Sequence, residues 1–485
     1  MKNYKIKLIF TATLLSLMSC SDDFVEVDSP DENSENYFNS EEDYQNALVG
    51  AYDLLQSTYL NVMLGEIASD NTLCGGESAT DVPGFQEIDD MNHTPVNANL
   101  RDIWNWMFAG VNRANFIMEF QDKTDFPGRI EVIAQTRFLR AYYYFELVKW
   151  FGDVPLVVDK RFQFGDQFEV DRTPKAEVYA QIEADLIFAA ENLPANQTET
   201  GRITKGAAQA LLGKAYLFQD KFSEAATVLD LVIAGPYDLV DDYNSIFEFE
   251  GENNIESVFE VQYTDEEGAG FECLQCSEGN VAVGFNGIRN YSGPLFESGF
   301  SFNIPTQEVV DEFEDGDIRK DVAILDINAW ADETGATFVA GYEHTGYYNR
   351  KYISRKGDLN TGDANLTNPN NYRAIRFADV LLMAAEANNR KTTADDSKAQ
   401  NYLNRVRNRA ELGDVTVTGS DLTNAIYHER RVELVGEGHR FFDLVRTGRA
   451  AQEIDGFVAG KHEVFPIPSI EIQLAGSRWN QNPQY

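Results

Sequence analysis

The sequence is short of positive charge. Its 485 residues include 40 Lys and Arg against 79 Asp and Glu, which gives a formal net charge of −39. Loss of the first 19 residues would remove three lysines and no acids, so 37 bases would face 79 acids and the charge would be −42. Such a balance excludes nucleic acid as a partner. It also disfavours an anionic polysaccharide, because the predicted loops hold no strongly basic stretch to attract one.

Cysteine and histidine are scarce as well. The four cysteines are too few for a disulfide framework, although Cys273 and Cys276 could form a disulfide in an oxidising place or remain free thiols. The five histidines are scattered, without the spacing of metal ligands. The sequence also has no Gly-x-Ser-x-Gly motif and no Walker loop. We therefore expect no metal, no cofactor and no nucleophilic or phosphate chemistry.

Long hydrophobic runs are absent too. The apolar run at 8–18 is too short to span a bilayer, and no later stretch reaches 18 unbroken apolar residues. Three lysines precede this run, and its end, Leu17-Met18-Ser19-Cys20, resembles the lipobox of bacterial lipoproteins. We therefore expect a signal peptide at 1–19, acylation of Cys20 and a flexible acidic tether at 20–36. The alternative is an ordinary secreted protein in which this cysteine occurs by chance.

Helical periodicity is what the sequence does contain. Apolar residues recur at helical spacing over 44–55 and again over 130–148. Residues 209–237 follow most of the tetratricopeptide helix-pair pattern, although the tryptophan of that pattern is missing. A further helix pair is predicted from residues 375–385 and 399–410. These patterns predict a mostly α-helical scaffold built from helix pairs.

Two stretches lack this periodicity. Residues 69–100 and 238–371 are loop-rich, with many glycine, asparagine and aromatic residues and short apolar runs. The helical scaffold is then expected at about 37–68, 101–237 and 372–450. Because long loops on a rigid scaffold usually carry binding sites, we expect the ligand site in the loop-rich lobe.

Several segments carry a more specific pattern, in a fixed order. They are 136–145 (TRFLRAYYYF), 151–155 (FGDVP), 201–202 (GR), 376–386 (RFADVLLMAAE), 403–410 (LNRVRNRA), 429–434 (ERRVEL), 437–446 (EGHRFFDLVR), 465–468 (FPIP) and 481–483 (QNP). With these segments the chain resembles the SusD/RagB family of Bacteroidetes nutrient-uptake lipoproteins over nearly its whole length. Gln484 departs from the family pattern, in which glycine is common at that place.

This resemblance implies a SusD-like domain over 37–485, no enzymatic activity, and a SusC-like TonB-dependent transporter as the partner. We therefore expect a lipid-anchored protein on the outer face of the outer membrane. It would capture a neutral oligo- or polysaccharide, for example a marine β-glucan, and pass it to the transporter. One alternative is a peptide-binding uptake lipoprotein of the same fold. Another is a helical-repeat scaffold for protein interactions.

A sugar site needs flat aromatic rings for the C–H faces and polar groups for the hydroxyl edges. The ligand-binding candidates in the two loop regions are Asp81, Phe85, Arg289, Tyr291 and Trp330. Trp104, Trp106 and Trp150 lie in helical stretches, and we interpret them as core residues. The arginines and acids of the shared segments are interpreted as structural, because a guanidinium group can hold a carboxylate between packed helices.

Overall fold

The computed structural model describes residues 37–163, 169–266, 270–357, 365–476 and 478–485. The predicted signal peptide, Cys20 and the acidic tether therefore lie outside the described residues. Within those ranges, no helix combines the length and the apolar character that a membrane crossing requires.

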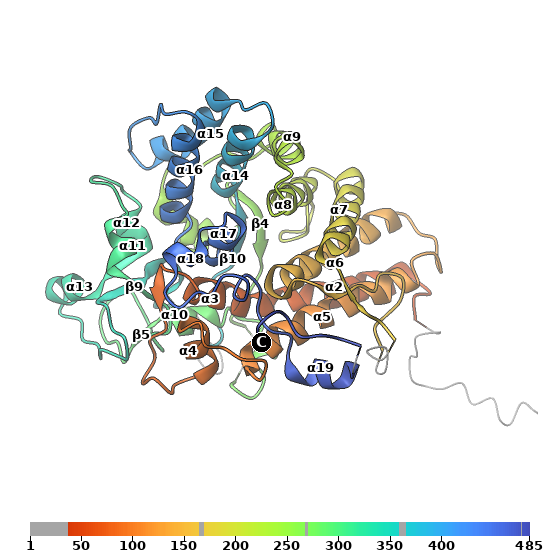
Figure 1. Cartoon of the computed structure of the whole chain (residues 1–485), viewed down its shortest axis with the longest axis horizontal. Helices are drawn as coiled ribbons and strands as arrows, with labels where there is room; N and C mark the ends of the chain where they lie inside the picture. Colours follow the sequence, from red (N-terminus) through yellow and green to blue (C-terminus); the bar gives the residue numbers. More distant parts are fainter. Residues whose placement is uncertain (1–36, 164–168, 267–269, 358–364, 477) are drawn as a thin grey trace, which may run out of the picture.

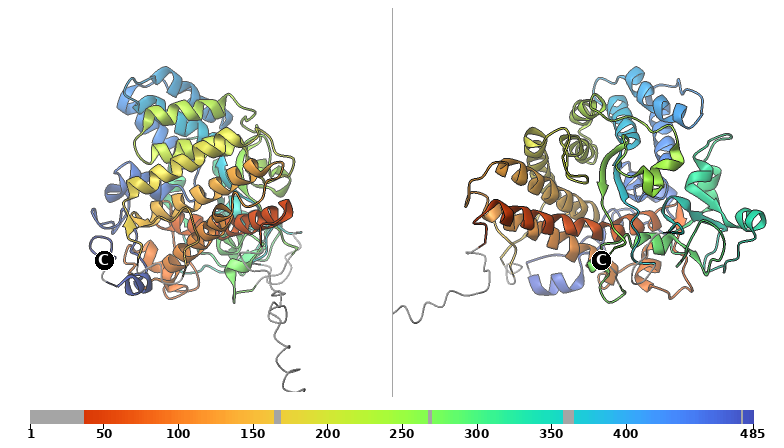
Figure 2. Two further views of the ribbon diagram at one scale, coloured as in Figure 1. Left: turned by 90° about the vertical axis from the view of Figure 1, so that its right-hand side faces the viewer. Right: turned by 180° about the vertical axis from the view of Figure 1, so that it is seen from behind.

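The larger part of the fold is a row of α-helices in which each helix packs against the next. The row consists of α2 (Glu41–Asp53), α5 (Ala98–Glu119), α6 (Arg129–Phe151), α7 (Lys175–Asn192), α8 (Lys205–Leu217), α9 (Phe222–Ile233), α14 (Phe377–Arg390), α15 (Asp396–Arg409) and α16 (Gly419–Glu433). The left-hand view of Figure 2 shows these helices stacked one above another, from red α2 to the blue helices at the top. The prediction of a mostly helical scaffold is confirmed.

Both predicted helix pairs are present. Thr204 begins α8 by accepting a hydrogen bond from the backbone N–H of Ala207, at 3.2 Å. Gly213 lies so close to Leu229 of α9 that a Cβ atom there would come within 2.4 Å of the leucine side chain, which explains why a small residue is needed where the two helices meet. The pair α14–α15 is confirmed with one correction. Ile375 belongs to a strand that precedes α14, because its backbone pairs with a distant segment.

The loop-rich lobe lies beside and below the row in Figure 1, with α11, α12 and α13 at the left. Its helices are α4 (Pro83–Asp89), α10 (Ala282–Asn286), α11 (Gln307–Asp311), α12 (Lys320–Ala323) and α13 (Ile327–Thr334). The one-turn 3-10 helices of the fold are η2 (Leu54–Thr58), η4 (Tyr243–Phe247), η5 (Phe249–Gly251), η6 (Leu274–Cys276) and η7 (Arg350–Tyr352). The remaining helices are α3 (Tyr59–Ile67), α17 (Arg440–Arg446), α18 (Ala450–Glu453) and α19 (Ser469–Ala475).

Strands occur as short pairs among the described residues. The pairs are β1 (Thr72–Leu73) with β7 (Ile304–Pro305), β2 (Val154–Pro155) with β3 (Arg172–Thr173), β4 (Ser257–Val261) with β10 (Tyr372–Arg376), β5 (Ile288–Arg289) with β6 (Ser298–Gly299), and β8 (Ile324–Asp326) with β9 (Tyr347–Asn349). All are antiparallel except β5–β6. The pair β1–β7 joins the two predicted loop regions to each other, and β4–β10 brings the ends of the longer one together.

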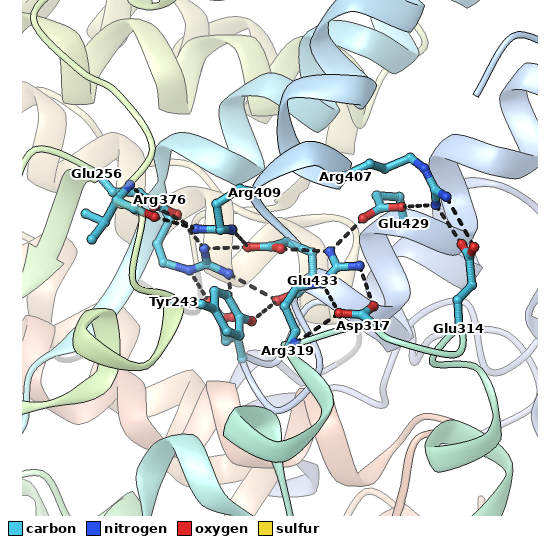
Figure 3. A network of polar contacts seen from close by, with 12 residues as sticks. Tyr243, Glu256, Glu314, Asp317, Arg319, Arg376, Arg407, Arg409, Glu429 and Glu433 are labelled. Atoms are coloured by element: carbon cyan, nitrogen blue, oxygen red, sulfur yellow. Dashed lines mark hydrogen bonds and ion pairs between the residues drawn. The ribbon is translucent and has the colours of Figure 1, made fainter. Parts of the chain in front are cut away.

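Buried charged residues form a network at the base of α14–α16 (Figure 3). Glu433 forms ion pairs with the guanidinium groups of Arg376 at 2.8 Å, Arg409 at 2.6 Å and Arg319 at 2.9 Å. Arg376 also pairs with Glu256 at 2.7 Å. Burial alone would raise the pKa of Glu433, but the guanidinium groups of Arg409, Arg376 and Arg319 hold it far below its usual value. These residues join elements far apart in the sequence, which supports the interpretation of Arg376, Arg409 and Glu433 as structural.

Candidate functional site

A cavity of about 640 Å³ lies where α3 and α5 meet the loop-rich lobe. Its volume falls within the range of roughly 300–1,000 Å³ of small-molecule sites. The lining residues are Tyr59 and Leu60 of α3; Glu77, Asp81, Val82 and Phe85 of the first loop region; Asn99, Asp102 and Trp106 of α5; residues 271–275; and Phe285, Arg289, Phe300 and Phe302. Five separate segments thus converge on this cavity.

The helix α5 contributes one polar and aromatic stripe. Asn99, Asp102 and Trp106 follow at spacings of three and four residues, so they lie on one face of the helix and line the cavity together. Trp104 is two residues before Trp106, points to the opposite side and is buried in the core. Asn97 begins the helix, and its side-chain oxygen accepts a hydrogen bond from the backbone N–H of Leu100 at 3.0 Å.

The first loop region is held against the second by backbone contacts. The N–H of Gly76 donates to the carbonyl of Ser301 at 2.7 Å, and the N–H of Tyr342 donates to the carbonyl of Gly76 at 2.9 Å. Gly76 has φ 98°, a conformation that favours glycine, and a Cβ there would meet the ring of Phe302 at 2.7 Å. The loop can therefore lie directly on that ring and present Asp81 to the cavity.

Aromatic rings form the floor and one wall of the cavity. Phe85, Phe285 and Phe302 are buried and contact one another, with ring centroids 5.5 to 5.6 Å apart. Trp106 is half-buried, and its ring centroid lies 6.1 Å from that of Tyr59. This arrangement gives the apolar surface that the C–H face of a sugar ring requires.

Phe271 stands at the rim. It is 56% exposed, and its ring centroid lies 5.8 Å from that of Phe300. The same segment contains the Cys273–Cys276 disulfide, which settles the question that the sequence left open for these two cysteines. Cys273 itself lines the cavity, so the cross-link belongs to the site.

The charges in the cavity are mostly negative. Arg289 is the cation among the lining residues that the structure describes, against the acids Glu77, Asp81, Asp102 and Glu272. Its Nη2 donates to Asp81 Oδ2 at 3.3 Å and to the carbonyl of Phe300 at 2.9 Å, while its buried Nε has no hydrogen-bond partner in the described part of the chain. Burial raises the pKa of Asp102. The cavity thus presents polar side chains, among them Asn99 and Asp102, beside its aromatic rings.

The structure distributes the sequence-predicted site residues over two places. Asp81, Phe85 and Arg289 line the cavity. Tyr291 and Trp330 do not; they pack in a small separate hydrophobic cluster of the lobe, where Trp330 Nε1 donates to the hydroxyl of Tyr291 at 2.8 Å. The hydroxyl of Tyr291 in turn donates to the carbonyl of Pro294 at 2.6 Å. Both polar groups are therefore engaged within the protein.

Sequence reasoning predicted Phe85 but missed the other aromatic lining residues, which are Tyr59, Trp106, Phe271, Phe285, Phe300 and Phe302. Trp106 was interpreted as core together with Trp104 and Trp150, of which the other two are indeed buried. The signal that separates them is the spacing, because residues two apart on a helix cannot face the same side. Phe271 lies in the second loop region, but nothing in its sequence neighbourhood distinguishes it from the other phenylalanines there.

Other cavities combine fewer of these features. Two spaces of about 320 and 300 Å³ flank β4 and share Arg202, which is already paired with Glu199 at 2.8 Å. A third, of about 40 Å³, lies among α6, α8 and α17 and is too small for a sugar ring. No group of three His, Cys, Asp or Glu side chains among the described residues is placed to hold a metal ion.

Comparison with known proteins decides the family. The profile of the SusD family matches residues 255–464, and a profile described as starch-binding associating with outer membrane matches residues 23–217. A solved structure of a laminarin-binding SusD-like protein is 35% identical, with a TM-score of 0.85 over 92% of this chain and 100% of that chain. The chain belongs to the SusD family. SusD-family glycan-binding proteins are non-catalytic, so the expectation that this chain is not an enzyme is confirmed.

Further SusD-family relatives match over nearly the full length. Surface glycan-binding protein A from Bacteroides thetaiotaomicron, solved in complex with laminarihexaose, is 28% identical with a TM-score of 0.81, covering 91% of this chain and 99% of that chain. SusD-like protein P2 of Formosa agariphila is 28% identical and covers 100% of both chains. The segments by which the SusD family was recognised in the sequence contribute no lining residue to the cavity. Family membership therefore does not by itself define the ligand.

Proposed function

We propose that this SusD-family chain is a cell-surface glycan-binding lipoprotein that captures a neutral oligo- or polysaccharide in the 640 Å³ cavity. The observation that carries the proposal is the convergence of an aromatic floor and wall with the polar side chains of Asn99, Asp102 and Arg289 in one open cavity. In the domain of residues 37–485, the helical row would then serve as the frame, while α5 and the loop-rich lobe together would form the receptor site.

We propose a β-glucan of the laminarin type as the ligand. Two SusD-family structures similar to this chain are described as binding laminarin or laminarihexaose, which supports this choice. The excess of acids in the cavity and the net charge of −39 also favour an uncharged glycan. The exposed part of Trp106 and the rim residue Phe271 would contact the sugar faces, while Asn99, Asp102 and Arg289 would contact the hydroxyl groups.

The proposal extends to location and partner. Acylation of Cys20 would anchor the chain to the outer membrane, and a SusC-like TonB-dependent transporter would receive the glycan. The family profile described as associating with the outer membrane supports this placement. Substitution Cys20→Ala should release the protein from the membrane fraction in the native host. Co-purification of the tagged full-length chain with a TonB-dependent transporter tests the partner.

The first experiment is calorimetry and affinity electrophoresis with protein that lacks residues 1–20. Laminarin and laminarihexaose should bind with a Kd in the micromolar to millimolar range, that is, about −8 to −4 kcal/mol. A neutral α-glucan and an anionic polysaccharide serve as comparison ligands. Absence of binding to every neutral glycan, together with binding of peptides, would replace this proposal with the peptide-uptake function.

A further inference from the structure

The rim of the cavity carries a covalent cross-link. Cys273 and Cys276 form a disulfide that encloses η6, and Cys273, Leu274 and Gln275 all line the cavity. Both cysteines are exposed. A short, exposed disulfide of this kind closes few residues and adds little to global stability, because the stabilisation grows with the length of the closed loop. Its position on the cavity points to a different role.

The rim loop is residues 271–276, and its C-terminal side is firmly attached to the rest of the fold. Ser277 is buried, and its Oγ donates to the carbonyl of Leu366 at 2.7 Å. Between the two cysteines, Leu274 packs against the main hydrophobic core, and η6, which ends at Cys276, contacts η2. Cys276 is thus held next to an anchored residue.

The N-terminal side of the rim loop makes weaker contacts with the rest of the fold. Phe271 is 56% exposed, and its ring contacts that of Phe300 at a centroid distance of 5.8 Å. The nearby backbone bonds are local turn bonds, such as that from the N–H of Cys273 to the carbonyl of Gly270 at 3.3 Å. The disulfide ties Cys273, two residues after Phe271, to the anchored Cys276.

We propose that the Cys273–Cys276 disulfide is a positioning device that holds Phe271 ready at the mouth of the cavity as a platform for a sugar face. This inference rests on the proposed glycan-binding function and adds to it. An unconstrained side chain loses conformational entropy when it is immobilised by the bound glycan. A ring that is already held in place avoids this cost, so binding is tighter. The cross-link therefore acts on affinity, through Phe271, and not on the stability of the fold.

A double-mutant cycle tests this coupling. Calorimetry with laminarihexaose is carried out on the wild type, the C273S/C276S variant, Phe271→Ala and the combined variant, all lacking residues 1–20. Loss of the disulfide should weaken binding roughly two- to tenfold, the cost of immobilising one side chain. Phe271→Ala should weaken it at least as much. The combined variant should bind no more weakly than Phe271→Ala, because the two changes act through the same contact.

Phe249→Ala is the matched control, since Phe249 is also 56% exposed but does not line the cavity, and it should leave affinity unchanged. The proposal is overturned if C273S/C276S binds as tightly as the wild type. It is also overturned if the two losses add in the combined variant, or if C273S/C276S unfolds at a much lower temperature. A wild type that binds no glycan would overturn the proposed function and this inference together.

Discussion

The base of the helical row and the cavity of the loop-rich lobe are both rich in charged groups, but they use them differently. At the base of α14–α16, Arg376, Arg409 and Arg319 meet Glu433 and further acids in a buried network of ion pairs. In the cavity, Arg289 is the cation among the described lining residues and faces an excess of acids, and the half-buried Asp102 has a raised pKa. Charges that are paired in the interior hold elements together, whereas acids that outnumber the facing cations beside open space can contact a ligand.

The same contrast appears in the response of each region to pH. The carboxyl groups of Glu433, Asp379 and Asp443 have pKa values far below normal, because the facing cations outweigh the effect of burial. Their stabilisation is present above the ordinary carboxyl pKa of about 4 and is lost as the pH falls through the lowered values. In the loop-rich lobe, burial raises the pKa of Asp89 to about 7, so this group opposes folding once it ionises. The two regions therefore depend on pH with opposite signs.

The largest effect is expected from breaking the buried network. Arg376→Met leaves Glu256, Glu433 and Glu437 without one of their cations, so the free energy of unfolding should fall by about 3–5 kcal/mol. Urea unfolding followed by circular dichroism measures it. Arg478→Met is the control, because its pair with Asp171 is solvent-exposed, with side chains 37% and 72% accessible, and should cost less than about 1 kcal/mol. Equal losses in the two variants would contradict the comparison.

The next largest effect is a loss of ligand affinity in one tryptophan variant, compared with a loss of stability in another. Trp106→Ala should weaken laminarihexaose binding roughly 30-fold, equivalent to about 2 kcal/mol, because it removes an aromatic wall of the cavity. Trp330→Ala removes a ring from the separate cluster and should lower the free energy of unfolding by roughly 1–3 kcal/mol while affinity stays the same. Calorimetry and denaturant unfolding on both variants measure the two effects. An affinity loss confined to Trp330→Ala would move the site to that cluster.

A smaller effect concerns Asp89. Its folded-state pKa of about 7 lies above the ordinary value, so the folded state binds more protons and this residue makes stability fall as the pH rises from about 4 to 7. Asp89→Asn should reduce this fall and keep an oxygen that can accept the hydrogen bond of the Cys74 N–H. Thermal unfolding of both proteins across that pH range measures the slope. An unchanged slope in the variant would assign the dependence to other groups.

The smallest effect concerns selectivity. Anionic glycans should bind more weakly than neutral ones because the acids of the cavity outnumber Arg289. Asp102→Asn should raise the affinity for a carboxylated glycan about two- to fivefold at low ionic strength, with less effect on a neutral one. The gain should shrink as salt screens the charges. Competition experiments against laminarihexaose at several salt concentrations measure it, and a gain that is independent of salt would argue against an electrostatic cause.

Local patterns in the sequence predicted the helical row well. The periodicity of 130–148 and the pairs around Gly213 and α14–α15 depend on residues three or four apart, which any helix brings together. Ile375 was assigned to the wrong element because its strand exists only through pairing with β4, more than 100 residues away. A short apolar run beside a helix does not reveal such a distant partner.

The sequence predicted the loop regions and the types of side chain that line the cavity, but not which individual residues line it. Asp81, Phe85 and Arg289 belong to loops that the fold brings together, whereas Tyr291 and Trp330 have equally suitable side chains but bind each other. No local pattern distinguishes these outcomes. The spacing of Trp104 and Trp106 does place them on opposite sides of α5, but both were interpreted as core, so Trp106 was missed. The disulfide required the three-dimensional structure, because Cys-x-x-Cys spacing allows either state.

The pairing of β4 with β10 has a consequence for how such a chain can evolve. It places residue 261 opposite residue 372, so the long segment between them leaves the helical row and returns to almost the same point. The entropic cost of a loop grows only slowly with its length once its ends are joined. Evolution could therefore lengthen, shorten or replace the segment between residues 261 and 372 while the helical row stays the same. A change of ligand would then require a new segment at this place but no new fold.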